Sequence, residues 1–428
     1  MKTYELKQIS GKKIKQLCSR QSIDYERLFD VVKPIIQNVK KNGDQALAQY
    51  TLKFDKVALQ NIKVGKGEID QAWSSSELDL IQSIETAIRN ITKFHTTQIK
   101  AEKRVETMTG VECFQENRPI EKIGLYIPGG SAPLFSTLLM LAIPARIAGC
   151  KKIVLCTPAN QKGDVSSPIL MAAKLCGVKE IYKVGGAQAI AAMAYGTESI
   201  PKVDKIFGPG NQFVVAAKML VSIDPDGAAI DMPAGPSEVL VIADRFANPK
   251  WVAADLLSQA EHGPDSQVVL LSNDQNIIRR VKKEIKCQLA ELPRSEIAQR
   301  ALNGSFCLVA ESLAKAFEFS NVYAPEHLIL NLKNAKTFCS KVVNAGSVFL
   351  GPYSTEAAGD YASGTNHTLP TSGYARSYSG VTVESFMKKI SFQKITPKGA
   401  LNIGPAVLVM AEKEGLIGHK KAMEYRIG

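Results

Sequence analysis

Histidine, aromatic residues and paired cysteines are scarce or absent in this chain of 428 residues. Aromatic side chains make up only 7% of the sequence, which argues against a stacking platform for single-stranded nucleic acid. No CxxC pair occurs, so neither a dithiol redox motif nor a cysteine zinc knuckle is present. Several of the eight cysteines lie in apolar contexts, as buried thiols do in a reducing compartment. They stand at positions 18, 113, 150, 156, 176, 287, 307 and 339.

Long apolar runs are missing as well. The first residues, Met1–Glu5, lack the apolar stretch of a signal peptide, and no run approaches the length that spans a bilayer. The apolar fraction of 45% and the charged fraction of 22% are those of an ordinary globular protein. We therefore expect a cytoplasmic protein without a membrane partner.

The net charge of +12 raises the question of a nucleic-acid partner, but the basic residues gather at the two ends. Residues 1–20 hold six Lys or Arg and one Glu, and residues 381–428 hold eight Lys or Arg and four Glu. Residues 228–272, in contrast, hold six acidic and two basic residues. An acidic region suits a cationic or metal-bound substrate better than a phosphate backbone. We expect solvated basic ends and no nucleic-acid partner.

From about residue 120 onwards, short apolar runs alternate with helix-like stretches. The chain is longer than one hydrophobic core usually serves, and such alternation predicts parallel sheets covered on both faces, so two α/β layers are expected. The predicted strands are 123–127, 153–156, 181–184, 206–207, 239–243, 268–271, 307–309 and 348–350. The predicted helices between them are 137–148, 166–176, 187–195, 211–222, 250–262 and 274–291.

The flanking regions differ from this pattern. The first hundred residues are predicted to be helical, starting with a helix that Asp24 caps and that stops near Asn42-Gly43. Pro34 predicts a kink or a division into two shorter helices. Residues 351–387 are rich in Gly, Ser, Thr and Tyr and are interpreted as an ordered functional loop.

Three glycine-rich turns each follow a predicted strand and precede a helix. They are Pro128-Gly129-Gly130-Ser131, Gly185-Gly186-Ala187-Gln188 and Gly208-Pro209-Gly210-Asn211. Backbone N–H groups approach a pyrophosphate in such a strand–turn–helix arrangement. No GxGxxG fingerprint occurs, so tight packing of β–α junctions remains a nearly equal explanation.

Four of the five histidines lie in the C-terminal part, three of them inside polar clusters. Gln259 and His262 are predicted to share one face of a helix that ends at Gly263-Pro264, so that an amide oxygen and an imidazole reach one ion. A histidine that only complements the helix dipole is an equal alternative. Glu326-His327 follows Pro325, and a turn there would direct both side chains to one site for proton transfer. A surface Glu–His pair is as good an explanation in isolation.

The third cluster joins Asp360, between two glycines, to His367 seven residues later. Carboxylate, imidazole and amide oxygen together suit Zn²⁺, with Mn²⁺ or Fe²⁺ less favoured. His419, near the end of the chain, carries no local motif and by itself indicates only an exposed tail residue. His95, in the helical N-terminal region, is interpreted as an ordinary residue.

Seven stretches, in one order along the chain, resemble the histidinol dehydrogenase family. The resemblance runs from about residue 25 to the C-terminus and shows no departure at a functional position. The stretches are 125–134 (LYIPGGSAPL), 184–189 (VGGAQA), 205–211 (KIFGPGN), 231–239 (DMPAGPSEV), 257–265 (LSQAEHGPD), 323–328 (YAPEHL) and 359–367 (GDYASGTNH).

The resemblance implies oxidation of L-histidinol to L-histidine through L-histidinaldehyde, with two NAD⁺ consumed and one Zn²⁺ bound per subunit. It implies that Glu326 and His327 are the acid–base residues, with His327 as the base and Glu326 activating water. The implied zinc ligands are Gln259, His262, Asp360 and His419, the last from the partner subunit of a homodimer. The implied substrate contacts are the zinc ligands with Ser237, His327, His367 and Glu414, and the implied NAD contacts are Tyr126, Gln188 and Asn211.

The expected architecture is two Rossmann-like parallel-sheet domains in an intertwined homodimer. Residues 1–22 are expected to form a helical arm, and residues 23–120 with 237–380 the first α/β domain, which carries most of the zinc and catalytic residues. Residues 121–236 are expected to form the NAD-binding domain, and residues 381–428 a tail domain that reaches the partner.

Three other functions compete with this one. A cysteine thiohemiacetal route, as in aldehyde dehydrogenases, would use Cys113, Cys150 or Cys156, none of which has an adjacent activating motif. A zinc hydrolase would use the same ligands without NAD⁺. A non-enzymatic RNA-binding role would show salt-sensitive binding.

Overall fold

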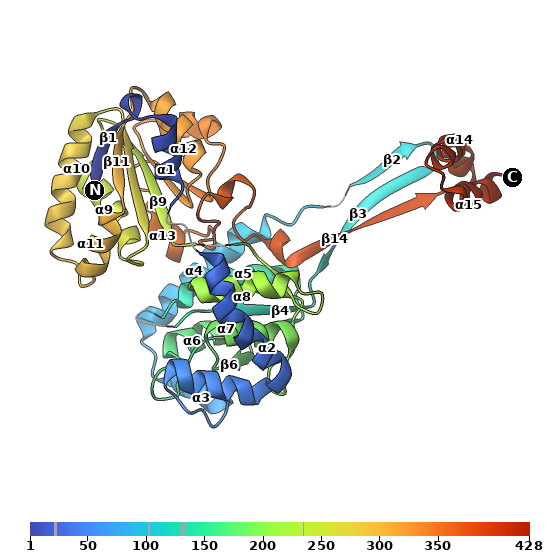
Figure 1. Ribbon diagram of the computed structural model, residues 1–428, viewed down its shortest axis with the longest axis horizontal. Coiled ribbons are helices and arrows are strands. Elements are labelled where there is room, and N and C mark those ends of the chain that lie inside the picture. Colours follow the sequence, from blue (N-terminus) through green and yellow to red (C-terminus); the bar gives the residue numbers. More distant parts are fainter. Residues whose placement is uncertain (21–23, 102, 130–132, 234) are drawn as a thin grey trace.

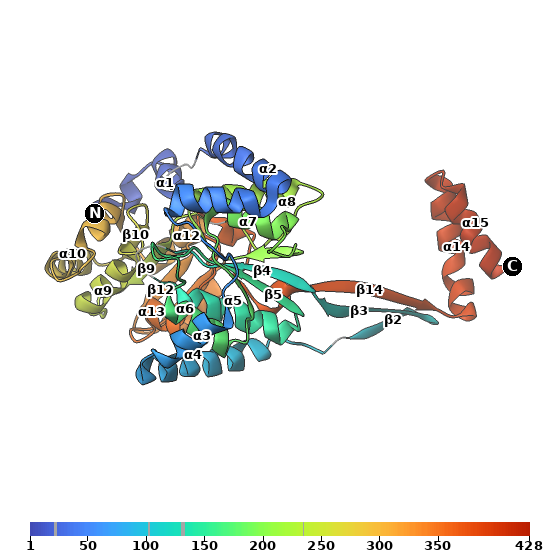
Figure 2. The same cartoon turned by 90° about the horizontal axis from the view of Figure 1, so that it is seen from below.

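The computed structural model describes residues 1–20, 24–101, 103–129, 133–233 and 235–428. Two parallel sheets, each covered by helices, lie side by side, and a long arm of three antiparallel strands carries a pair of helices away from them (Figures 1 and 2). The N-terminus lies at the outer edge of one sheet, and the C-terminus lies at the far end of the arm (Figure 1). Among the described residues, no helix is long and apolar enough to cross a membrane.

The five-stranded sheet has the order β6-β5-β4-β7-β8, and all its strands are parallel. The first strand is central, the second and third lie on one side of it and the fourth and fifth on the other, which is the doubly wound order. The strands are β4 Lys122–Tyr126, β5 Lys152–Cys156, β6 Glu180–Tyr182, β7 Lys205–Phe207 and β8 Ala229–Ile230, and the helices between them are α5 Phe135–Ala148, α6 Ser167–Leu175, α7 Gly186–Tyr195 and α8 Gln212–Ile223.

The N-terminal helices cover this five-stranded sheet. Helix α2 (Tyr25–Tyr50) packs on α7 and α8, while α3 (Lys66–Ser74) packs on α6 and α4 (Leu78–Thr96) on α5. The predicted cap is confirmed, because Asp24 accepts the N–H of Arg27 at 3.1 Å. Pro34 lies inside the helix, and the irregularity falls instead at Gly43, whose φ is +48°.

That packing corrects the expected domain division. Residues 25–96 share apolar cores with the five-stranded sheet, so their assignment to the same domain as 237–380 is wrong. The helices are amphipathic, and their sequence does not specify which of two similar sheets receives the apolar face. Residues 22 and 23, where the first boundary was placed, lie outside the described residues.

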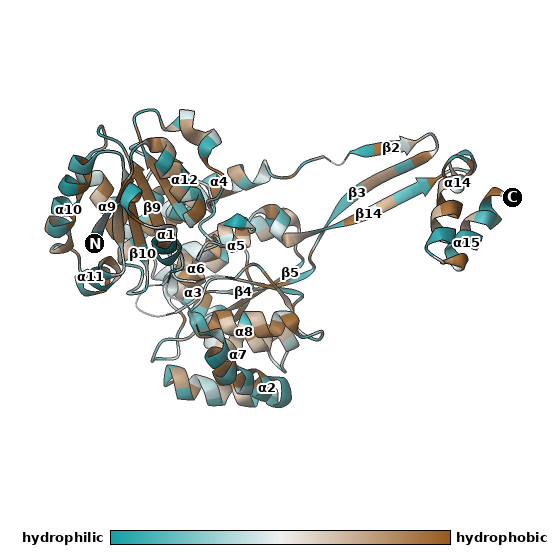
Figure 3. Cartoon of the chain, turned by 45° about the horizontal axis from the view of Figure 1, so that its top comes forward, coloured by the Kyte–Doolittle hydropathy of each residue, from teal (hydrophilic) through white to brown (hydrophobic). Residues whose placement is uncertain are grey.

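The six-stranded sheet has the order β1-β11-β10-β9-β12-β13 and is also entirely parallel. Alternate residues of β9 enter apolar cores on opposite faces, so both faces are covered. Figure 3 shows these strands as the apolar centre of the domain. Its strands are β9 Glu238–Ala243, β10 Gln267–Ser272, β11 Phe306–Val309, β12 His327–Asn331 and β13 Ser347–Leu350, and its helices are α9 Pro249–Ala260, α10 Gln275–Leu289, α11 Ser295–Asn303, α12 Leu313–Tyr323 and α13 Glu356–Tyr361.

The first residues of the chain complete this sheet. Strand β1 (Lys2–Glu5) pairs in parallel with β11, and α1 (Gly11–Cys18) follows after the short turn η1 (Leu6–Gln8). The expectation of a helical N-terminal arm is therefore wrong for its first residues. The strand is too short, and too polar on its exposed positions, for its pattern to predict pairing.

The arm is built from two distant segments. Strands β2 (Arg104–Met108) and β3 (Val111–Pro119) form a hairpin, and β14 (Met387–Ile395) pairs antiparallel with β3 along nine residues. Helices α14 (Pro397–Lys413) and α15 (Ile417–Ile427) pack on each other at its tip. The expected tail domain 381–428 was therefore incomplete, because the β2–β3 hairpin belongs to the same arm. The remaining elements are short helices. They are the π-helix η2 Thr51–Asp55 and the 3₁₀ helices η3 Ala335–Lys341, η4 Tyr374–Arg376 and η5 Val383–Phe386.

Candidate active site and nucleotide cavity

Glu326 and His327 lie where two central strands of the six-stranded sheet begin. His327 is the first residue of β12 and pairs with Val239, next to the start of β9. The N–H of Glu238 donates to Glu326 Oε2 at 2.8 Å, and the N–H of Glu326 donates to Glu238 Oε1 at 3.3 Å. The predicted turn is present, since Ala324 before Pro325 has a φ of +52°. The site therefore occupies the amino edge of the sheet.

Arg20 balances the charge of Glu238, which is 1% exposed. Its guanidinium donates to both carboxylate oxygens, at 2.7 Å each, and lies 3.7 Å from the ring centre of Tyr323. The pKa of Glu238 is raised because burial outweighs Arg20. A paired guanidinium of this kind fixes a buried carboxylate in one orientation. Sequence reasoning missed both residues, since neither has a motif of its own.

Gln259 and His262 reach the site from the C-terminal end of α9. The helix ends at Ala260, earlier than predicted, and His262 follows it in an exposed turn. Gln259 is fully buried, with its amide against Glu356. With its nitrogen facing that carboxylate, Gln259 donates to both oxygens, to Oε2 at 3.2 Å.

Glu356 is a site residue that the sequence prediction did not include. Its carboxylate and donor atoms of His262 and Asp360 all lie within 4.8 Å of one another. It is 1% exposed and begins α13, after Thr355 as the helix cap. The cap motif predicts a helix start, where a glutamate is ordinarily solvated, so no local pattern indicates this burial.

His327 lies among three carboxylates. Its Nδ1 is 3.7 Å from Glu356 Oε1 and 3.6 Å from Glu326 Oε2, and its Nε2 is 3.7 Å from Asp360 Oδ1. Burial alone would lower the pKa of His327, but Glu356 and Glu326 outweigh it and raise that pKa to about 10. Burial, opposed by His327, raises the pKa of Glu356 to about 8. The three carboxylates favour the protonated imidazole, so a bound cation that offsets their charge would allow it to act as a base.

His367 connects the site to the other domain. Its Nδ1 lies 2.9 Å from the backbone oxygen of Asp360, and its Nε2 lies 3.1 Å from Thr137 Oγ1 on α5. Burial lowers the pKa of His367. The neighbouring Asn366 donates to Met140 O and approaches His95 Nε2 at 3.5 Å. His95, interpreted as ordinary from the sequence, is fully buried beneath this loop.

Three predicted residues are not placed against the cluster. Ser237 immediately precedes β9, beside Glu238. Glu414 and His419 are exposed and lie on the helical pair at the tip of the arm, remote from the two sheets (Figure 1). Within one chain, the structure therefore does not bring His419 to Gln259, His262 and Asp360.

Tyr126, Gln188 and Asn211 line one cavity of about 990 Å³ at the carboxyl edge of the five-stranded sheet. The Tyr126 hydroxyl accepts the N–H of Gly186 at 3.1 Å, and Asn211 caps α8 by accepting the N–H groups of Phe213 and Val214. Two helices thus begin at this cavity, and helix N-termini favour phosphate. Gly130 and Ser131 of the first predicted turn lie outside the described residues.

The turn before α8 needs its glycine and is held by a buried ion pair. Gly208 has a φ of +124°, and a Cβ there would lie 2.1 Å from the oxygen of Tyr126. Asp231 Oδ2 accepts the N–H of Gly208, while Lys218 donates to Gly208 O, both at 2.9 Å. Lys218 and Asp231 also pair with each other. Both backbone polar groups of Gly208 are thus bonded within the chain, which makes the turn rigid.

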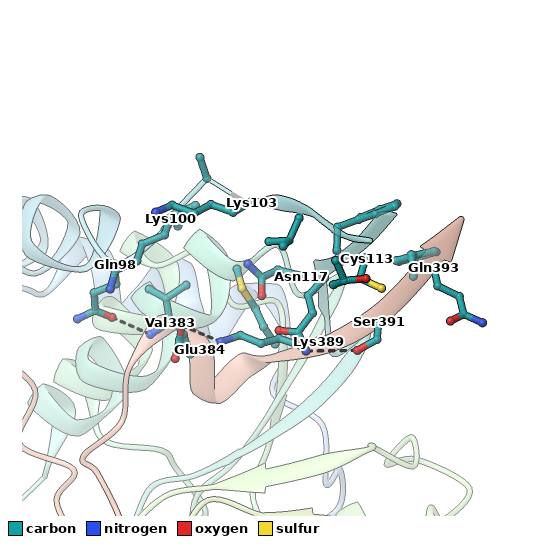
Figure 4. Close-up of a pocket in the computed structure, with 18 residues that line it drawn as sticks. Gln98, Lys100, Lys103, Cys113, Asn117, Val383, Glu384, Lys389, Ser391 and Gln393 are labelled. Atoms are coloured by element: carbon teal, nitrogen blue, oxygen red, sulfur yellow. Dashed lines mark hydrogen bonds and ion pairs between the residues drawn. The ribbon is translucent and has the colours of Figure 1, made fainter. Parts of the chain in front are cut away.

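A second cavity, of about 930 Å³, lies at the base of the arm. Figure 4 shows its wall, where Val383 N donates to Gln98 at 2.9 Å and Lys389 donates to Glu384 at 3.3 Å. Its floor is the face of the arm strands, with Val105 54% exposed. None of the residues predicted for the active site lines it.

The donor set at the amino edge suits zinc. Imidazole nitrogen and carboxylate oxygens from His262, Asp360 and Glu356 are ligands that Zn²⁺ takes, and Gln259 adds an amide oxygen. Asp360 Oδ1 is buried and, among the described residues, has no hydrogen-bond partner. A buried carboxylate oxygen without a donor is what a cation would satisfy. The residues of this chain therefore fit a metal.

Comparison with known proteins identifies the family. The family model described as histidinol dehydrogenase matches residues 18–427. The chain belongs to the histidinol dehydrogenase family. A histidinol dehydrogenase of Bacteroides thetaiotaomicron is 54% identical over 412 residues, which are 96% of each chain. The chloroplastic enzyme of Arabidopsis thaliana is 52% identical over 100% of this chain and 91% of its own length.

The fold agrees with the family. The crystal structure of histidinol dehydrogenase from Elizabethkingia anophelis has a TM-score of 0.97 and 54% identity, and the match covers 100% of this chain and 98% of that one. The resemblance drawn from the seven sequence stretches is thereby confirmed, as is the α/β class with parallel sheets. The roles of the individual residues stay predictions.

Proposed function

We propose that this oxidoreductase of the histidinol dehydrogenase family oxidises L-histidinol to L-histidine through L-histidinaldehyde, with NAD⁺ as the hydride acceptor. The observation that carries the proposal is that one chain holds two unlike sites, a buried imidazole–carboxylate cluster and a separate cavity bounded by glycine turns. A zinc hydrolase needs only the first. Helix α5 joins the two, because Pro133 before it lines the cavity and Thr137 contacts His367.

His327 is the base of both oxidation steps in this proposal. It removes the hydroxyl proton of histidinol as a hydride leaves the carbon for NAD⁺, which gives the aldehyde. In the second step, the same imidazole removes a hydroxyl proton from the hydrated aldehyde as the second hydride leaves for NAD⁺. Its Nε2 is buried and, among the described residues, has no hydrogen-bond partner, so it is available to the substrate.

Glu326 activates the water that converts the aldehyde to its hydrate. Its carboxylate is buried and held by the N–H of Glu238, so it keeps one orientation between the two steps. The hydrate then loses its second hydride and becomes the carboxylate of histidine. Burial keeps the aldehyde from solvent, where it would react.

Zinc is assigned to Gln259, His262, Asp360 and the partner subunit's His419, with Glu356 of this chain beside them. Bound zinc would hold the substrate's imidazole and amine nitrogens and offset part of the carboxylate charge. Ser237, His367 and the partner subunit's Glu414 complete the proposed substrate contacts. Glu414 favours the cationic amine.

The exposed helical pair at the tip of the arm supports a homodimer with shared sites. Helix α15 has no buried residue in the single chain, and Val409, Met410 and Tyr425 are 59%, 64% and 78% exposed. An exposed apolar surface of this kind marks an interaction site. A second copy of the chain is the proposed occupant, and its arm brings His419 to the cluster.

Stoichiometry tests the reaction. Histidinol and excess NAD⁺ are mixed with the zinc-loaded protein, and the NADH formed per histidinol consumed is measured. We expect a ratio of two. One NADH per histidinol would contradict the second oxidation step. Hydrolysis without any NADH would favour the zinc hydrolase.

Subunit complementation tests the shared site. Inactive His327→Ala and His419→Ala chains are co-expressed, and a heterodimer of the two has one site with both defects and one with neither. Random pairing in a two-fold dimer predicts about a quarter of wild-type activity. The control pairs His327→Ala with Glu326→Gln, two residues that the same chain contributes to a site, so this mixture should not restore the formation of histidine, which is the product measured in both mixtures. Equal activity in both mixtures would contradict the proposed delivery of His419.

A further inference from the structure

Three buried polar atoms in the nucleotide cavity have no hydrogen-bond partner among the described residues. They are Asp55 Oδ2, Thr157 Oγ1 and Gln188 Oε1, and all three residues line the cavity. Thr157 is fully buried and Gln188 is 1% exposed. Buried polar atoms are ordinarily paired, so three orphaned atoms around one space indicate a ligand that supplies hydrogen-bond donors.

Asp55 is the charged residue of this lining. The other described residues around the cavity are apolar or uncharged, including Val31, Ile35 and Phe54 beside it. Burial raises the pKa of Asp55, and burial together with the nearby Asp55 charge helps to raise the pKa of Tyr126 to about 12. The Oδ2 atom of this carboxylate is buried within the cavity lining.

The topology explains why an acidic residue arrives from this direction. In doubly wound dinucleotide-binding sheets, an acidic residue after the first βα unit binds the ribose hydroxyls. Here β5 is the second strand of that order, and Thr157-Pro158-Ala159-Asn160 follow it without a carboxylate. Asp55 lines the same cavity as Thr157 and Pro158.

The segment that carries Asp55 is held in place. Asp55 is the last residue of η2, which continues α2. Lys56, whose φ is +60°, follows in a left-handed conformation and ends the helix. Phe54 stacks on Tyr50, with ring centres 5.7 Å apart. Because α2 packs on α7 and α8, the carboxylate is fixed relative to the helices that begin at the cavity.

We infer that Asp55 selects NAD⁺ over NADP⁺, by accepting hydrogen bonds from the vicinal hydroxyls of the adenosine ribose at the end of β5. The Thr157 hydroxyl contacts the same sugar. A 2′-phosphate would replace a donor with an anion facing a carboxylate, which is repulsive. This assignment rests on the proposed use of a nicotinamide dinucleotide and adds the residue that determines which one is used.

The test compares cofactors in matched variants. Steady-state oxidation of histidinol is measured with NAD⁺, NADP⁺ and 2′-deoxy-NAD⁺ for the wild type and for Asp55→Asn. We expect Asp55→Asn to lower kcat/KM for NAD⁺ roughly 30-fold, mainly through KM, because charge-assisted hydrogen bonds are lost. The kcat/KM for NADP⁺ should not fall, so the ratio of kcat/KM for NAD⁺ to that for NADP⁺ should decrease. The wild type should use 2′-deoxy-NAD⁺ at least about tenfold less well than NAD⁺, and the variant should use both alike.

Asp30→Asn is the control, since Asp30 is an exposed carboxylate on α2 outside the cavity lining. It should leave all three cofactors unchanged. An unchanged KM for NAD⁺ in Asp55→Asn, or a wild type that accepts NADP⁺ or 2′-deoxy-NAD⁺ equally well, would overturn the inference. The wild-type comparison can still overturn the inference where Asp55→Asn does not fold.

Failure of the proposed function gives a different result. Fluorescence titration with NADH and NADPH, without histidinol, measures cofactor binding separately from turnover. Binding of NADH that depends on Asp55, together with no oxidation of histidinol, would overturn the proposed reaction and retain the inference. Oxidation of histidinol with NAD⁺ that is indifferent to Asp55 would do the reverse.

Discussion

Five strands of each parallel sheet follow the same order, and the residues proposed for catalysis and for NAD⁺ lie at opposite edges of the two sheets. In the five-stranded sheet the cavity lies where β4, β5 and β7 end, and in the six-stranded sheet the cluster lies where β9 and β12 begin. Open parallel sheets ordinarily bind ligands at the carboxyl edge of the switch point. The second sheet therefore shows that strand order alone does not determine which edge is used.

The backbone chemistry of the edges explains the difference. At the amino edge of the six-stranded sheet, the N–H groups of Glu238 and Glu326 each donate to the carboxylate of the other residue, which allows both acidic side chains to be buried there. At its carboxyl edge, Asp244 accepts the N–H groups of Phe246 and Lys333, which joins the turns that follow β9 and β12.

The largest predicted effect separates the two edges. His327→Ala should lower kcat by about 10³-fold, since it removes the proposed base, while zinc remains bound. Asn211→Ala, at the other edge, should act mainly on KM for NAD⁺ through the cap of α8. Steady-state kinetics and metal analysis measure both. Equal losses of kcat in the two variants would contradict the division of roles.

Glu326→Gln should distinguish the two steps within the acidic cluster. Only oxidation of the aldehyde needs an activated water, so that half-reaction should slow by about 10²-fold while oxidation of the alcohol is largely spared. Histidinaldehyde and histidinol are supplied separately, and NADH is followed. Wild-type rates with histidinaldehyde would remove the water-activating role.

Arg20→Met tests the stability of the buried charges at the amino edge. It leaves Glu238 buried and unpaired, and should lower the free energy of unfolding by roughly 3 kcal/mol. The control is Lys151→Met, which breaks an exposed pair with Glu121 and should cost under about 1 kcal/mol. Urea denaturation measures both. A similar loss in the two variants would show that Glu238 is solvated.

Asp255→Asn tests the pH dependence of the same region. Burial raises the pKa of Asp255 to about 7, so the folded state keeps a proton that the unfolded chain releases near pH 4. Stability should therefore fall as pH rises from about 4 to 7. In metal-free protein, the free energy of unfolding of Asp255→Asn relative to that of the wild type should rise by about 2 kcal/mol from pH 5 to pH 8. Thermal unfolding at both pH values measures this.

The smallest expected effect concerns the cysteines. Burial raises the pKa of Cys150 to about 12 and that of Cys156 still further, so both remain thiols, and Cys113 lies on the arm. Alanine at Cys113 or Cys150 should leave turnover within about twofold of wild type, in contrast to His327→Ala. A large loss at one of them, with an intact fold, would revive the thiohemiacetal route.

Much of the fold followed from local pattern. The apolar runs predicted the strands of both sheets from β4 onwards, apart from β8 and β12, because strands covered on both faces consist of consecutive apolar residues. His327 opens β12 inside a polar motif, which concealed that strand. The arm strands were not predicted, since β2 and β14 carry mostly exposed polar residues.

By itself, the sequence determined the family, the glycine turns and the motifs that hold Gln259, His262, Glu326 and His327, since these depend on residues close together in the chain. Tertiary structure alone decided that Glu356 is buried among them, that the N-terminal helices cover the five-stranded sheet, and that Asp55 lines the cavity at the carboxyl edge of that sheet. Each is a contact across many residues of chain, and its energy comes from burial and charge that no local pattern records.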